Sequence, residues 1–291
     1  MAIEDFTELL VELIRRASTD LPADVEAALR TAHDREETGS AAASTLSAIL
    51  ENVAMARARS QPICQDTGTP IFHIRYPAGM SAKALRAQAE AAVAEATRRA
   101  YLRPNAVDSI TGRNSGNNLG IGFPAFHMEE GEEDVLEVAL LLKGGGSENV
   151  SIQYSLPYEP LKAGRDLEGV RRVVLDAVHR AQGEGCAPGI LGVCIGGDRG
   201  TAYTYAKMQL LRPLDDVNPM PELAALEERL RRECNELGVG PMGFGGKTTV
   251  LGVKIGAAHR LPACYFVTVA YMCWACRRAW MEIRNGTVVY S

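Results

Sequence analysis

The sequence lacks the features of secretion, membrane insertion and nucleic-acid binding. Its acidic start has no basic region followed by an apolar core, which a signal peptide requires. No uninterrupted apolar run reaches the roughly 20 residues of a membrane span. Acids and bases are interspersed, with a formal net charge of −5 and no basic patch. These absences predict a soluble, cytoplasmic protein that binds neither membrane nor nucleic acid.

The sequence also lacks repeats, low-complexity tracts and an obvious flexible linker. Hydrophobic residues make up 46% of the 291 residues and charged residues 23%, a balance typical of globular proteins. The seven cysteines are an odd number in a chain without an export signal, which disfavours a disulfide framework. Metal binding, catalysis and burial remain as roles for these thiols.

Hydrophobic periodicity predicts a mixed α/β domain. The segment 101–130 is dense in glycine, asparagine and proline and is expected to form long ordered loops. Glycine-rich loops follow several strands, where α/β proteins commonly build their sites. We expect helices over 3–16, 40–59, 82–100, 167–182 and 221–237, and strands over 135–142, 190–195, 249–255, 266–272 and 287–290.

Three glycine loops expose several backbone N–H groups each: KGGGSEN at 143–149, GVCIGGDRG at 192–200 and GPMGFGGKT at 240–248. Successive amides of this kind suit anionic ligands. None of the loops has the glycine spacing of a P-loop, and no strand leads into G-x-G-x-x-G, so a nucleotide site is weakly supported. Tight turns are the plain alternative for each loop.

Most cysteines carry little information by themselves. Cys194 lies in an apolar strand and Cys264 beside one, so both are expected in the core. Cys234 lies in a charged helix. The pair Cys273 and Cys276 lacks the second pair that a zinc site would need.

Cys64 and Cys186 differ because polar or turn-forming residues surround them, in PICQDTG and EGCAPG. A thiol in a loop, close to amide donors, is where a thiolate ligand would lie. The segment 62–70 also places a thiol, an amide, a carboxylate and a hydroxyl side by side. It is either an ordinary polar turn or a segment whose thiol and carboxylate face the same site.

Eight segments resemble, in order, the alpha subunit or N-terminal domain of the class I, iron–sulfur fumarase and L(+)-tartrate dehydratase family. They are CQDTG at 64–68, LRPNAV at 102–107, GRNSGNNLGIGFP at 112–124, KGGGSEN at 143–149, GCAPG at 185–189, IGGDRGTAYTYAK at 195–207, GPMGFGGKTTVLGV at 240–253 and AYMCWACRR at 270–278. The resemblance covers roughly residues 50 to 280. It implies one hydro-lyase alpha domain over 1–291, with a helical part at about 1–60 and a cluster- and substrate-binding body at about 61–285.

The resemblance implies that Cys64, Cys186 and Cys273 hold a [4Fe–4S] cluster. Cys194 and Cys276 do not fall on the ligand positions of the family. Iron–sulfur clusters usually take four thiolates, so three leave one iron open for substrate or water. That iron can act as a Lewis acid.

The resemblance also assigns the substrate site. Asp66 would act on the substrate hydroxyl, and Gln65 would hydrogen-bond the substrate. The planar fork of Arg103 would bind a carboxylate, and the amides at Gly144 and Gly145 would contact the same ligand. From the residues alone, Asp66 could merely cap the following turn and Arg103 could form a surface ion pair.

One position departs from the family pattern. The family commonly has Arg-His-Pro upstream of the third cysteine, and here Leu261 falls where that histidine would be. His259, two residues earlier, is the remaining candidate for this substrate contact.

The implied activity is that of an alpha subunit of a [4Fe–4S]-dependent hydro-lyase, which reversibly hydrates fumarate to (S)-malate. The alternatives are dehydration of L(+)-tartrate or a related hydroxy-diacid, and a non-catalytic binding protein that retains the fold. The family takes its catalytic base and further substrate-binding residues from a beta subunit or fused region. We therefore expect the chain to be inactive alone and to work in a homodimer of alpha–beta units on a small dicarboxylate.

Overall fold

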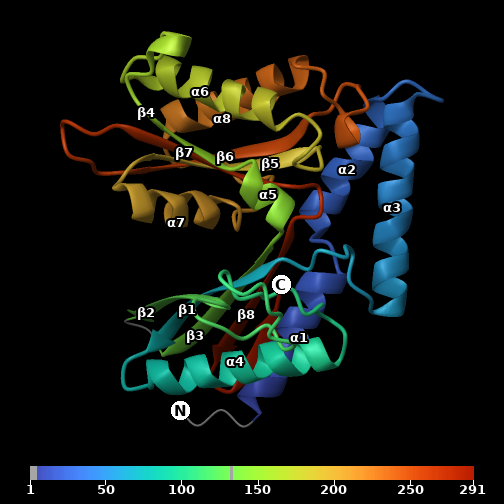
Figure 1. Ribbon diagram of the computed structural model, residues 1–291, viewed down its shortest axis with the longest axis vertical. Helices are drawn as coiled ribbons and strands as arrows, with labels where there is room; N and C mark the ends of the chain where they lie inside the picture. Colours follow the sequence, from blue (N-terminus) through green and yellow to red (C-terminus); the bar gives the residue numbers. More distant parts are fainter. Residues whose placement is uncertain (1–4, 132–133) are drawn as a thin grey trace. The chain divides into compact units, whose positions relative to one another are not determined.

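The computed structural model describes residues 5–131 and 134–291, which divide into two compact units. The first unit comprises the described part of 1–22 together with 51–145 and 277–291. The second comprises 23–50 and 146–276. Each unit contains one β-sheet with helices packed on it (Figure 1), which confirms the mixed α/β fold class.

The first unit is built on a five-stranded sheet in the order β2-β1-β3-β8-β9. Strands β1 and β2 are parallel, and the remaining neighbours are antiparallel. The bounds are Thr69–Pro77 for β1, Ala125–Gly131 for β2, Val135–Lys143 for β3, Arg277–Arg284 for β8 and Thr287–Tyr290 for β9.

Two helices, α1 (Phe6–Thr19) and α4 (Ala82–Arg98), pack together, and α1 lies on the sheet. Alternate strand residues such as Phe72 and Leu140 are fully buried in the core that these helices share with the sheet. Full burial of such a side chain contributes about 2 kcal/mol. Helix α4 begins after Ser81, whose hydroxyl accepts from the Ala84 N–H at 3.3 Å, as the sequence predicts.

The opposite face of this sheet carries one row of side chains across four strands. His127, His73, Ala139 and Trp280 are in register on β2, β1, β3 and β8. The rings of His73 and His127 stack with centroids 4.6 Å apart. Burial, and then repulsion from His127, lower the pKa of His73 to about 4.

The second unit is built on a four-stranded sheet in the order β4-β7-β5-β6. Strands β5 and β6 are parallel, and β7 is antiparallel to both of its neighbours. The strands are β4 (Ile152–Ser155), β5 (Gly189–Gly196), β6 (Val250–Ala258) and β7 (Phe266–Met272). The helices are α2 (Ala23–Arg35), α5 (Gly145–Asn149), α6 (Leu167–Ala181), α7 (Arg199–Gln209) and α8 (Pro221–Glu236), while α3 (Ala41–Arg59) contains the boundary between residues 50 and 51.

Glycines on one face of this second sheet allow α7 to lie close to the strands. A Cβ on Gly192 would lie 2.1 Å from the carbonyl oxygen of Ala206, and one on Gly256 would lie 2.7 Å from Gln209 Nε2. The alternate residues of β5, including Leu191 and Val193, point into the core on the other face. Figure 1 shows α7 on one side of this sheet and α6 and α8 on the other.

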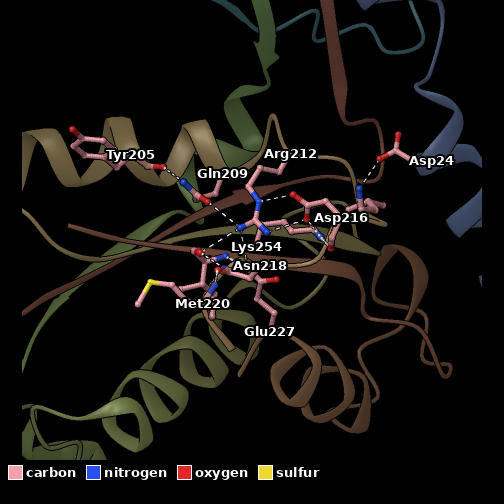
Figure 2. Close-up of polar contacts among 11 residues, drawn as sticks. Asp24, Tyr205, Gln209, Arg212, Asp216, Asn218, Met220, Glu227 and Lys254 are labelled. Atoms are coloured by element: carbon pink, nitrogen blue, oxygen red, sulfur yellow. Dashed lines mark hydrogen bonds and ion pairs between the residues drawn. The ribbon is translucent and has the colours of Figure 1, made fainter. Parts of the chain in front are cut away.

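Side chains close the free edge of β6. Glu227 Oε1 accepts from the Ile255 N–H at 2.6 Å, and Asn218 Nδ2 donates to the Ile255 carbonyl at 2.7 Å. Arg212 Nη1 lies 3.0 Å from the same Glu227 oxygen (Figure 2). Asn235 Oδ1 accepts the N–H groups at the start of the strand. These bonds satisfy an edge that could otherwise pair with another strand.

Asp216 joins this network to Lys254, which is almost fully buried (Figure 2). Burial raises the pKa of the Asp216 carboxyl, but hydrogen bonds from Arg212 and Lys254 outweigh that effect, so its pKa lies below the ordinary value. The carboxylate form is therefore part of the folded structure.

Most predicted elements are present with ends shifted by a few residues, and two strands, 266–272 and 287–290, have the predicted bounds. The helix expected over 3–16 runs from Phe6 to Thr19 in the described residues, and Ile3 lies outside them. The prediction of loops throughout 101–130 is wrong at its end, where β2 forms; its half-exposed AFHMEEG sequence hides the strand periodicity. The sequence did not predict α2, α5, α7, β4 or β8.

Of the helices that the structure describes, not one combines the length and apolar character that crossing a membrane requires.

Candidate active site

The loop that carries Asp66 lies tightly against the end of β3 in the first unit. Asp66 Oδ2 accepts from the Gly145 N–H at 2.7 Å, and Oδ1 accepts from the Gly68 N–H at 3.0 Å. Gly68 has φ +79°, and a Cβ there would lie 2.7 Å from the carbonyl carbon of Lys143. Asp66 thus caps its own turn, which was the plain alternative, and also binds the glycine loop at 143–149.

Arg277, the first residue of β8, lies beside Asp66. Its guanidinium Nη1 donates to the Asp66 carbonyl, and a Cβ on Gly144 would lie 3.3 Å from Nη2. The side chain is 1% exposed, and its Nε has no hydrogen-bond partner within residues 5–131 and 134–291. No carboxylate in that described part pairs with it. The Asp66 carboxylate borders the same space, because a Cβ on Gly144 would lie 3.1 Å from Asp66 Oδ2. Negative charge close to a buried guanidinium offsets part of the cost of burying it.

A hydrogen-bonded loop places Arg103 next to Asp66. The buried Thr67 hydroxyl accepts from the Arg103 N–H at 3.2 Å and from Asn105 Nδ2 at 3.1 Å. Asn118, also buried, accepts from the Asn105 N–H at 2.8 Å and donates to the Arg103 carbonyl at 2.7 Å. The backbone at Arg103 is therefore fixed on both sides.

The side chains of Arg103 and Gln65 are exposed. Arg103 Nη1 reaches the Gln65 carbonyl at 3.4 Å, and none of the carboxylates that the structure describes forms an ion pair with it. The first unit thus brings together five of the predicted site residues, namely Gln65, Asp66, Arg103, Gly144 and Gly145, with Cys64 half-buried at the start of the same loop.

The second unit holds two neighbouring cysteine loops. Cys186 lies between α6 and β5 with φ +53°, and its carbonyl accepts from the Trp274 N–H at 3.2 Å. Cys273 follows β7, and its N–H donates to the Ser147 hydroxyl at 3.1 Å. Both side chains are half-buried. The hydrogen bond between the two loops keeps both cysteines at one end of the four-stranded sheet.

Tyr271 lies close to these two cysteines. Its side chain is 1% exposed, and its hydroxyl has no hydrogen-bond partner among the residues that the structure describes. Burial, then the thiols of Cys273 and Cys186, raise the pKa of the phenol. Glycines make room for the ring: a Cβ on Gly189 would lie 2.4 Å from Tyr271 Oη, and one on Gly185 would lie 2.4 Å from Cε1.

The remaining cysteines differ in exposure. Cys194, Cys234 and Cys276 are buried, as predicted for Cys194. Burial raises the pKa of Cys194 to about 11 and that of Cys234 to about 12, which makes both thiols unreactive. Cys264, expected in the core, is half-buried because it lies just before β7 begins rather than within it. None of the seven cysteines, all of which the structure describes, takes part in a disulfide.

His259 lies away from the cysteine loops. It follows β6, whose last residue Ala258 pairs with Gly196 at the end of β5, whereas Cys186 lies just before the start of β5. The two positions are at opposite ends of the same sheet. His259 is exposed, as is Leu261, at 72%. The structure does not bring His259 together with Cys186 and Cys273.

The three cysteines implied as cluster ligands are divided between the units. Cys64 belongs to the first, and Cys186 and Cys273 to the second. Across residues 5–131 and 134–291, no group of three or more His, Cys, Asp or Glu side chains is arranged to hold a metal ion. The ligand set and the substrate residues therefore remain predictions.

Several well-placed residues were not singled out from the sequence. Thr67, Asn118, Tyr271 and Arg277 each lie inside a segment that carries the family resemblance, but nothing local marks them. Their importance comes from burial and from partners far away in the chain.

The described residues form a mixed α/β chain with glycine loops, a fixed carboxylate and half-buried thiols. The family model described as fumarate hydratase (Fumerase) matches residues 7–282, and the chain belongs to this family.

Curated relatives agree with this assignment. A Geobacillus stearothermophilus protein named as a class I fumarate hydratase is 51% identical over 288 residues, which cover 98% of this chain and 56% of that protein. A Methanocaldococcus jannaschii protein named as an L(+)-tartrate dehydratase alpha subunit is 35% identical over 283 residues, covering 96% of this chain and 97% of that protein. The L(+)-tartrate dehydratase subunit alpha of Escherichia coli K12 is 32% identical over 284 residues, covering 95% and 90%. The chain thus spans about half of the first relative and nearly all of the other two.

Proposed function

We propose that the chain is the alpha subunit of a [4Fe–4S]-dependent hydro-lyase that reversibly hydrates fumarate to (S)-malate. The observation that carries this proposal is the loop at 64–68. It places a half-buried thiol two residues from a carboxylate that two backbone N–H groups hold in place. Family membership and the 51% identity to a protein named as a fumarate hydratase support the reaction class.

Cys64, Cys186 and Cys273 would hold the cluster. The donor set fits: all three thiols are half-buried, whereas Cys194 and Cys276 are buried. The orphaned Tyr271 hydroxyl beside Cys186 and Cys273 also fits a polar group at that position. When bound, the cluster would supply a Lewis-acidic iron for the substrate hydroxyl.

The chain's own residues would bind the substrate and move one proton. Asp66 would exchange a proton with the substrate hydroxyl as that group leaves or returns as water. Gln65 would hydrogen-bond the substrate, and Arg103 would bind a carboxylate. The loop at Gly144 and Gly145 would contact the same anion, while the Gly145 N–H also holds Asp66 in place. The buried Arg277 cation adds positive charge on this side of the loop. His259 would be the remaining substrate contact. Because it lies far from Cys186 within the chain, the His259 that reaches the site would belong to another part of the assembly.

We further propose a beta-type partner that supplies the catalytic base and additional substrate contacts, within a homodimer of alpha–beta units. Relatives named as alpha subunits, and a relative nearly twice as long as the region it shares with this chain, support the partner. Seven cysteines that form no disulfide in the described structure support a cytoplasmic location, where thiols stay reduced. The single hydro-lyase domain over 1–291 likewise remains part of the proposal.

The test is anaerobic reconstitution with iron and sulfide, followed by fumarate hydration assays with and without the beta-type subunit. We expect activity only with the partner, and a loss of about 10²-fold or more in Asp66→Asn, because the proton-transferring group is removed. Asp108→Asn is the matched control, since Asp108 is an exposed turn-capping carboxylate in the same unit. Full turnover by the cluster-loaded chain alone would contradict the two-subunit proposal.

The second candidate activity is dehydration of L(+)-tartrate. It is favoured by the two relatives of matching length, both named as tartrate dehydratase alpha subunits. Comparing rates on fumarate and L(+)-tartrate with the same reconstituted pair decides between these substrates. An anaerobic preparation without iron or sulfide would instead indicate a binding protein that has lost catalysis.

A further inference from the structure

Within the described part of the chain, the hydroxyl of Tyr271 is buried without the hydrogen bond that a buried polar group normally forms. Its side chain is 1% exposed, and no atom of residues 5–131 or 134–291 accepts from or donates to its hydroxyl. Burying a hydroxyl without a partner opposes folding, and such groups are rare in folded proteins. A phenylalanine at 271 would fill the same space without this cost, so the hydroxyl itself requires an explanation.

The surroundings of the hydroxyl point to the cysteine loops. The backbone around Tyr271 is held by α5 and the residues after it: Ser151 accepts from the Tyr271 N–H at 3.1 Å, and Ser147 accepts from the Cys273 N–H at 3.1 Å. Gly189 leaves room for Tyr271 Oη beside the strand that begins just after Cys186. The ring thus packs against Gly185 and Gly189, which flank Cys186, and its hydroxyl lies at Gly189.

We propose that the Tyr271 hydroxyl donates a hydrogen bond to a sulfur atom of the cluster that Cys186 and Cys273 hold. This inference rests on the proposed function, because it requires the cluster. Tyr271 is then a positioning residue: it touches the cofactor's sulfur and does not react with the substrate.

Two consequences follow for the loaded protein. Hydrogen bonds to cluster sulfur stabilise the reduced, more negative state and so raise the reduction potential. A second-shell hydrogen bond also helps to retain the metal, typically by 10- to 100-fold in affinity. Without the hydroxyl, the cluster should have a more negative midpoint potential and lose iron faster.

The experiment compares wild type, Tyr271→Phe and Tyr154→Phe, each reconstituted anaerobically as the full chain. Tyr154 is the matched control because it is a buried tyrosine of the same core, on β4 opposite Val267, and its hydroxyl donates to Asp176 at 2.7 Å. Three quantities are measured: the melting temperature of the metal-free chain, the midpoint potential of the cluster, and the rate of iron loss to a chelator.

We expect the metal-free Tyr271→Phe chain to melt at the wild-type temperature or higher, since it loses an unsatisfied hydroxyl. Its cluster should have a more negative potential and lose iron about tenfold faster. Tyr154→Phe should show the reverse: a lower melting temperature, because its bond to Asp176 is lost, with an unchanged potential. A wild-type cluster and a Tyr271→Phe cluster with equal potentials and equal iron loss would overturn the inference alone. A wild-type chain that binds no iron–sulfur cluster would overturn the inference and the proposed function together.

Discussion

Replacing His73 by phenylalanine is expected to make the protein lose less of its free energy of unfolding in mild acid. The folded protein keeps His73 neutral, with a pKa lowered to about 4 from an ordinary value of 6.5 by burial and then by His127. In the unfolded chain the same imidazole takes up a proton as the pH falls through 6.5. The stability due to the neutral form is therefore complete above pH 6.5 and is lost between pH 6.5 and about 4.

The size of the effect follows from the shift. Each pKa unit is worth about 1.4 kcal/mol, so the difference between 6.5 and 4 amounts to about 3.5 kcal/mol at the acid limit and about 2 kcal/mol at pH 5. Phenylalanine keeps a flat ring against His127, with which His73 stacks at 4.6 Å. The ion pair of Arg75 with Glu137 on the same face is present in both proteins.

The assay is urea denaturation of the metal-free chain at several pH values from 7.5 to 4.5. Trp280 lies in the same row of the sheet as His73, and its fluorescence in a Trp274→Phe background reports this unit, because the chain has two tryptophans. His179→Gln, which removes an exposed imidazole, is the control. The reasoning is refuted if His73→Phe and wild type lose the same free energy of unfolding between pH 7.5 and 5.

Three further changes test how the second unit is packed, each read as a change in melting temperature and urea midpoint. Gly192→Ala should destabilise by ~2 kcal/mol, because the new Cβ would lie 2.1 Å from the Ala206 carbonyl oxygen; an unchanged midpoint would show that α7 can move away. Glu227→Ala should cost ~3 kcal/mol, since the Ile255 N–H loses its acceptor and the half-buried Arg212 keeps only Asp216 as a carboxylate partner, and a neutral result would mean that water replaces the carboxylate. Asp166→Ala should cost ~1 kcal/mol, because the carboxylate caps α6 through the Gly169 N–H at 2.7 Å; no loss of helix stability would contradict the capping role.

Helices and strands were predictable where their sequence signals lie within a few residues of one another. Helix α4 combines apolar spacing with a capping Ser81, and α8 begins with Pro221 and ends before Gly238, which has φ +67°. Strand β7 is apolar except for Thr268, and it is buried along its whole length. These signals depend on neighbours a few residues apart, so they survive in a single sequence.

Features that depend on distant partners were not predictable. Strand β8 begins with two arginines that read as surface residues, yet both are buried, because β3 lies beside them in the sheet. The roles of Asp66, Arg103 and the cysteines were inferred from the family resemblance, because residue spacing alone does not indicate them. Thr67 gains its significance from hydrogen bonds with Arg103 and Asn105, and Tyr271 from burial against Gly185 and Gly189. These partners are distant in the sequence, and no periodicity carries such information.

The interleaving of the two units affects the order in which they can fold during synthesis. All residues of the second unit have been made once Cys276 is added, whereas the first unit still lacks β8, the strand that lies between β3 and β9. Until β8 arrives, β3 presents an apolar edge with unpaired backbone groups, which is a template for pairing with another nascent chain. The second sheet can therefore be complete while the first, although begun earlier, is still open to misassembly on the ribosome.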